Sequence, residues 1–89
     1  MMSSGQLRAA RALLGMDQKT LAEEAGVSLP TIQRMEASDG IVRGTVETLT
    51  KVIEALSRCG VDLIGDSVRS DQGGRGVRLN RPLPPRDPS

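Results

Sequence analysis

The sequence of 89 residues contains no Phe, Tyr, Trp or His, and its only cysteine is Cys59. Without aromatic rings, the hydrophobic core has to be built from Leu, Ile, Val, Met and Ala, which suits small helices that pack closely. The lack of aromatics also removes base stacking, the usual means by which proteins bind RNA and single strands. With no His and one Cys, a zinc site, a Cys–His nucleophile and a disulfide framework have no support.

Long hydrophobic runs and a strong net charge are missing as well. No run is long enough for a transmembrane helix, and residues 1–15 lack the apolar core of a signal peptide, so we expect a soluble, cytoplasmic protein. The formal net charge is +1, and the excess of Arg lies in residues 67–89. A near-neutral domain does not bind phosphates through its overall charge, so any DNA binding depends on where its basic residues lie.

The most informative stretch is residues 17–36, which predicts two short helices joined by a tight turn. Asp17 is a suitable N-cap for the first helix, and Gly26 can end it in the left-handed conformation. Ser28 is a suitable N-cap for the second helix, whose first turn tolerates Pro30. This arrangement is a helix-turn-helix, which presents its second helix to the major groove of DNA.

Further elements are expected on both sides of this stretch. A helix over residues 4–14 begins at the capping-box pair Ser3 and Gln6, and a longer helix runs from the cap Thr45 to Cys59. The longer helix carries an apolar stripe of Val46, Leu49, Ile53 and Leu56. Residues 61–64 and 77–79 predict two strands that pair either as a hairpin within one chain or across a dimer.

The chain therefore divides into three parts. Residues 1–60 form the helix-turn-helix domain, residues 61–80 hold the strands, and residues 81–89 form a flexible, Pro-rich tail. A domain this small has a thin core, so dimerisation adds stability. We expect the strands to serve that purpose and to bury their apolar side at the dimer interface.

A resemblance to a known family rests on residues at fixed spacings. They are Leu7-Arg8-x-x-Arg11 and Asp17-Gln18-x-x-Leu21-Ala22-x-x-Ala25-Gly26-Val27-Ser28-x-x-Thr31-Ile32-x-x-x-Glu36. These motifs are similar to those of the Cro/CI-type, or Xre-type, helix-turn-helix regulators, and residues 60–79 resemble the end of short, single-domain bacterial members. The resemblance implies a mainly α, lambda-repressor-like DNA-binding domain of four to five helices with a short C-terminal β-strand pair.

The same resemblance implies a transcriptional regulator, most often a repressor, that binds an inverted-repeat operator in double-stranded DNA as a homodimer. By position in the motif, the residues that would face base edges are Leu29, Pro30, Gln33 and Arg34. Those that would contact the DNA backbone are Gln18, Ser28, Thr31 and Arg43. It also suggests a structural ion pair between Arg11 and Glu36. Of these residues, Arg34 is the best candidate for direct readout, because a guanidinium can bond guanine O6 and N7 together.

Other interpretations of these residues stay open at this point. Ser28 and Thr31 also suit a helix cap, Pro30 suits any first helical turn, and exposed Arg residues are common. The near-neutral charge and the apolar Leu29-Pro30 also fit a protein-interaction module of the same fold, such as an antitoxin or an antagonist of another regulator. An enzyme has little support, because the sequence offers no nucleophile paired with a base. We expect no cofactor, no metal and no membrane partner.

Overall fold

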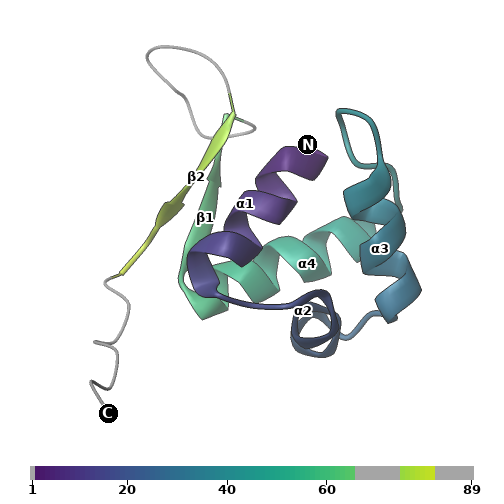
Figure 1. Cartoon of the computed structure of the whole chain (residues 1–89), viewed down its shortest axis with the longest axis horizontal. Helices are drawn as coiled ribbons and strands as arrows, with labels where there is room; N and C mark the ends of the chain where they lie inside the picture. The colour runs from purple at the N-terminus through teal and green to yellow at the C-terminus, as the bar shows by residue number, and fades with distance from the viewer. Residues whose placement is uncertain (1, 66–74, 82–89) are drawn as a thin grey trace.

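The computed structural model of the chain describes residues 2–65 and 75–81. Within these residues lie four helices and one antiparallel pair of strands (Figure 1). In chain order the elements are α1 (Ser4–Leu14), α2 (Gln18–Ala25), α3 (Leu29–Ala37), α4 (Val46–Cys59), β1 (Val61–Ile64) and β2 (Gly76–Leu79). The prediction of a mainly α domain with a C-terminal strand pair is confirmed. The predicted tail over residues 81–89 lies outside the described residues, except for Arg81.

Each helix begins at a side-chain cap that the sequence marks. The Ser3 hydroxyl accepts a hydrogen bond from the Gln6 N–H at 3.0 Å, and Gln6 Oε1 accepts one from the Ser3 N–H at 2.8 Å. Asp17, Ser28 and Thr45 cap α2, α3 and α4 in the same way, each accepting from the backbone N–H three residues on. Because these signals are local, the helix boundaries follow the sequence closely.

The core is formed by aliphatic side chains from all four helices and β1. Among the largest buried side chains are Met2, Leu7, Leu21, Ile32, Val42, Val52, Leu56 and Val61. One position of the predicted stripe on α4 is wrong, because Val46 is 77% exposed. Val46 is the first residue of α4, and no other part of the described chain covers its side chain. Leu49 and Leu56, further along the same helix, are buried.

The two strands pair within one chain, with Val61 opposite Leu79 and Leu63 opposite Val77. Of the two pairings that the sequence allowed, the structure shows the hairpin. Val61 is 1% exposed, and Leu63 and Val77 pack against the core. The apolar side of the strand pair is thus covered by the chain's own helices, which differs from the expectation that it lies at a dimer interface. The strands lie at the opposite side of the molecule from α3 (Figure 1).

Candidate nucleic-acid interface

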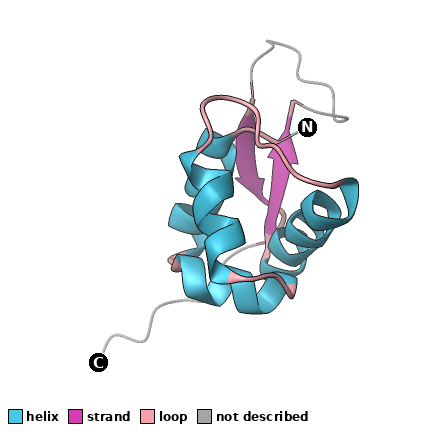
Figure 2. Cartoon of the chain, turned by 90° about the vertical axis from the view of Figure 1, so that its right-hand side faces the viewer, coloured by secondary structure: helices cyan, strands magenta, loops and turns pink. Residues whose placement is uncertain are grey.

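Helices α2 and α3 form the predicted helix-turn-helix. Gly26 ends α2 with φ of 70°, a conformation that strains other residues, and the chain enters α3 two residues later through the cap Ser28. Helix α3 lies at one side of the molecule, and Figure 2 views the chain from that side. One side of the second helix of the motif therefore faces outward.

Three of the four predicted base-facing residues are exposed together on α3. Pro30, Gln33 and Arg34 follow the i, i+3, i+4 spacing of a single helix face, and all three are exposed. Leu29 differs from them, since it is half-buried and packs against the core. Only part of its side chain is left to meet a thymine methyl group.

Two of the four predicted backbone-contacting residues take part in the cap of α3. The hydroxyl groups of Ser28 and Thr31 lie 2.8 Å apart, and Ser28 Oγ accepts from the Thr31 N–H. Arg34 Nη2 reaches back to Thr31 Oγ1 at 3.4 Å, a long contact. The Arg34 guanidinium thus lies over the first turn of α3.

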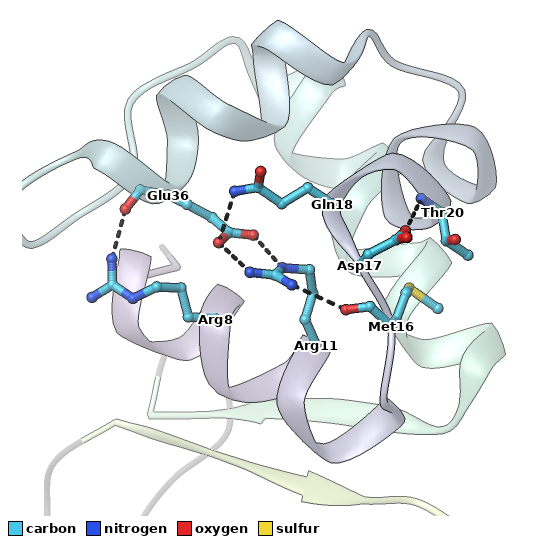
Figure 3. A network of polar contacts seen from close by, with 7 residues as sticks. All are labelled: Arg8, Arg11, Met16, Asp17, Gln18, Thr20 and Glu36. Carbon is cyan, nitrogen blue, oxygen red and sulfur yellow. Dashed lines mark hydrogen bonds and ion pairs between the residues drawn. The ribbon is translucent and has the colours of Figure 1, made fainter.

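A buried carboxylate fixes the angle between α1, α2 and α3 (Figure 3). Glu36, near the end of α3, is 4% exposed and forms a two-point ion pair with Arg11 of α1. Arg11 Nε donates to Oε2 at 2.5 Å and Arg11 Nη2 donates to Oε1 at 2.7 Å, so the suggested pair is confirmed. The hydrogen bonds to Glu36 raise the pKa of Arg11 above its usual value.

Further donors complete the surroundings of Glu36 and Arg11. Arg8 Nη1 donates to the Glu36 carbonyl oxygen at 2.6 Å, and Arg11 Nη1 donates to the Met16 carbonyl oxygen at 3.0 Å (Figure 3). Arg8 thereby satisfies a carbonyl at the negative end of the α3 dipole. The network joins α1 to both helices of the motif and holds α3 in one orientation.

Gln18, predicted to contact the DNA backbone, also belongs to this network. Its Nε2 donates to Glu36 Oε1 at 3.2 Å, which commits one of its two amide hydrogens (Figure 3). The second hydrogen is left for an acceptor such as a phosphate oxygen. No local pattern in the sequence indicates the Gln18–Glu36 bond, because it depends on how α2 and α3 cross.

The start of α2 carries a negative charge beside Gln18. Asp17 Oδ1 accepts from the Thr20 N–H at 2.7 Å (Figure 3). Hydrogen bonds from the side chain and backbone of Thr20 lower the pKa of Asp17 below its usual value. The carboxylate therefore stays charged at neutral pH and opposes part of the attraction that the α2 dipole offers to a phosphate.

Arg43, the last predicted contact, is exposed in the loop between α3 and α4. This loop is attached to the start of the chain: the Ser4 N–H donates to the Gly40 carbonyl and the Val42 N–H to the Met2 carbonyl, both at 2.9 Å. Ser28 and Arg43 thus flank α3 at its two ends. Sequence reasoning missed the attachment, because nothing in residues 2–4 marks them as a partner for the loop.

The described residues hold no group of three His, Cys, Asp or Glu side chains arranged to bind a metal ion. None of the helices that the structure describes has the length and apolar character needed to cross a membrane.

Comparison with known proteins supports the interpretation of α2 and α3. The family model described as helix-turn-helix matches residues 7–64, the segment from within α1 to the end of β1. No curated protein matches the chain. The matched segment contains Arg11, Glu36 and all of the predicted contact residues.

Proposed function

The chain belongs to the Xre-type helix-turn-helix family of DNA-binding transcription regulators, and on that premise we propose that it is a sequence-specific repressor. It binds an inverted-repeat operator in double-stranded DNA as a homodimer and has no catalytic activity. The observation that carries the proposal is the shared exposed face of Pro30, Gln33 and Arg34 on a helix whose orientation the Glu36 network fixes.

In the proposed complex, the start of α3 enters the major groove. Arg34 bonds O6 and N7 of a guanine, and Gln33 pairs with an adenine through its amide. Pro30 and the exposed part of Leu29 pack on a thymine methyl group. These contacts read sequence, because each base pair shows a distinct pattern of donors, acceptors and methyl groups in the major groove.

Contacts to the DNA backbone set the register of α3 in the groove. Gln18 at the start of α2 and Ser28 and Thr31 at the start of α3 donate to phosphate oxygens next to helix N-termini. Arg43 contacts phosphate from the loop at the other end of α3. Such contacts contribute affinity for all sequences alike and carry no sequence information of their own.

Dimerisation follows from the small number of bases that one copy can contact. One recognition helix reads only a few base pairs, too few to select one site in a genome. Two copies related by a two-fold axis read two half-sites whose centres lie about 34 Å apart. We assign the dimer contact to the free edge of β2, because β2 has one strand neighbour among the described residues and its residue Leu79 is 39% exposed.

Selection of bound duplexes from a random-sequence library tests the proposal. We expect enrichment of an inverted repeat with half-site centres about 10 base pairs apart. Enrichment of a single, non-repeated site would contradict the homodimer. A library without any enriched sequence would contradict sequence-specific binding altogether.

The charge of the helical domain supports a second candidate function. Residues 1–60 carry seven basic and seven acidic side chains, and one of the acidic ones, Asp17, is a charged carboxylate beside a predicted phosphate contact. These features favour a protein-interaction module of the same fold, such as an antitoxin or an antagonist of another regulator. Stable co-purification with a second protein, together with no enriched DNA sequence, would favour that function over the repressor.

A further inference from the structure

The start of the chain lies where two distant parts of the molecule meet. In Figure 1, the N-terminus of α1 lies between the loop that joins α3 to α4 and the strand pair. The proposed function uses the loop through Arg43 but gives no role to residues 2–6. Their contacts reach the loop on one side and the strands on the other.

The first set of contacts joins the segment to the loop. Ser3 and Ile41 form an antiparallel bridge, flanked by the bonds from the Ser4 N–H to the Gly40 carbonyl and from the Val42 N–H to the Met2 carbonyl. The side chains of Met2 and Val42 are each 1% exposed. The loop is thus held by backbone bonds and by burial directly before Arg43.

The second set joins the segment to the strands through one buried amide. Gln6 is 3% exposed, and its Nε2 donates to the Ile64 carbonyl at 2.8 Å and to the Gly76 carbonyl at 3.0 Å. Ile64 and Gly76 face each other at the last pair of the sheet. Since Gln6 Oε1 also accepts from the Ser3 N–H, all the donors of this amide and its oxygen have partners.

We propose that residues 2–6 act as a positioning segment for DNA binding, which holds the loop so that Arg43 meets a phosphate. The inference rests on the proposed function, since it requires that Arg43 contacts DNA. A loop without these bonds would sample many conformations, and the entropy cost of ordering it would then weaken each binding event. Ser4 and Gln6 are positioning residues, because they act on DNA through Arg43.

The substitution Ser4→Pro removes the bond to the Gly40 carbonyl and places a ring carbon in the space between the two groups, so the loop has to move away from the start of α1. Ser4 is the first residue of α1, a position where proline is well tolerated. Ser3, with ψ of 157°, already has the extended conformation that a residue before proline requires. Proline has no N–H to donate to Gly40. Ser4→Ala is the matched control, since it removes the same hydroxyl group but keeps the N–H.

Binding to a duplex of random sequence, measured at several salt concentrations, reports the effect on Arg43. If Arg43 no longer neutralises its phosphate, Ser4→Pro should bind about eightfold more weakly at 0.1 M salt, and its salt slope should fall by about 0.9. Ser4→Ala should bind like the wild type. Combining Ser4→Pro with Arg43→Ala should cost no more than Arg43→Ala alone, and additive effects would overturn the proposed role.

Amide hydrogen exchange without DNA tests the attachment independently of the proposed function. The Val42 N–H should exchange faster in Ser4→Pro than in Ser4→Ala, and equal rates would overturn the positioning segment. A wild-type protein that binds no duplex would overturn both the proposed function and the role of Arg43, while faster exchange would still show that the bonds hold the loop.

A second pair of variants covers the case in which Ser4→Pro does not fold. Gln6→Met keeps the side-chain volume but removes the donors to Ile64 and Gly76, whereas Ser3→Ala weakens the same cap and keeps those donors. Faster exchange at Val42 in Gln6→Met than in Ser3→Ala supports the proposal. The same rate in both variants contradicts it.

Discussion

Glu36 does the most to hold the helices of the motif in place. Its buried carboxylate accepts from Arg11 and Gln18, and its carbonyl accepts from Arg8. A buried ion pair of this kind adds little net stability to the fold. Removing one partner is costly, however, because the other charge is then buried without compensation. The network therefore serves chiefly to fix the angle at which α3 is presented.

Removing Arg11 alone should destabilise the fold strongly. We expect Arg11→Met to lower the free energy of unfolding by about 3 kcal/mol, because Glu36 is left buried and unpaired. Arg11→Met combined with Glu36→Leu should recover much of that stability. Denaturant melts of both single variants and the double variant measure the coupling, and simple additivity would contradict an energetic pair.

Arg34 and Arg43 should differ in what they contribute to DNA binding. Arg34→Ala should reduce discrimination at one base position of each half-site by roughly 1–3 kcal/mol. Arg43→Ala should weaken binding to all sequences and flatten the salt dependence. Isotherms on selected and scrambled duplexes separate the two effects, and equal weakening on both duplexes would exclude Arg34 from readout.

A charge-matched control accompanies these two variants. Arg58 lies in the last turn of α4, and Figure 1 shows this end of the helix beside β1, on the side of the molecule away from α3. Arg58→Gln removes one positive charge there and should leave both sequence discrimination and the salt slope close to those of the wild type.

At the scale of single residues, the sequence predicted positions better than contacts. The family resemblance implied that Gln33 and Arg34 face outward and suggested the pair of Arg11 with Glu36, and the structure shows both residues exposed and the ion pair formed. It did not predict that Leu29 packs on the core or that Gln18 bonds Glu36. Those contacts depend on the angles at which helices pack, which local spacing does not determine.

At the scale of elements, the capping residues were the main reason that the helices could be predicted from the sequence. The four helix starts were predicted because a cap is a bond between residues three apart in the sequence. The start of the apolar stripe on α4 was misplaced, because helical spacing identifies a face but not where the neighbouring helices end. The sequence did not determine whether the two strands pair within one chain or between two chains. The alternation of apolar and polar residues along each strand is the same in both cases.

The cap of α2 should make stability depend on acid. The pKa of Asp17 is lowered from 3.8 by the hydrogen bonds from Thr20. A lowered folded-state pKa contributes stability that is present above about pH 4 and is lost as the pH falls through the folded-state value. Asp17→Asn keeps a capping oxygen but cannot titrate, so it serves as the reference.

Denaturant melts of the wild type and Asp17→Asn from pH 7 to pH 2 measure this contribution. The difference in unfolding free energy should be constant above about pH 5 and should shift against the wild type at lower pH. A difference that stays constant down to pH 2 would show that the Thr20 bonds do not favour the charged carboxylate.

At the scale of the whole molecule, the strand pair belongs to the same packed unit as the helices. Val61 lies in the core and Gln6 bonds the carbonyls at the end of the sheet. The strands therefore stabilise the domain, and the proposed dimer contact is left to the free edge of β2. The sequence could not show which part of the strand pair packs on the helices and which part is left for a partner. It does not reveal which face of a strand the helices of the same chain cover.

A charge at the free edge of β2 should break the proposed dimer. Leu79→Lys is expected to give a monomer in light scattering and weaker binding to the selected inverted repeat. Leu13→Lys is the matched control, since Leu13 is 38% exposed, against 39% for Leu79, but lies on α1. A dimeric Leu79→Lys variant would move the interface away from β2.

The spacing of the two half-sites tests most directly whether the protein reads DNA as a symmetric dimer. Inserting about 5 base pairs between the half-sites of the selected inverted repeat turns one of them to the opposite face of the duplex. Equilibrium binding to the original and lengthened duplexes is then compared at one salt concentration. The proposed homodimer predicts a drop in affinity on the order of a hundredfold, because only one α3 can then meet its bases. Equal affinity for both duplexes would contradict it.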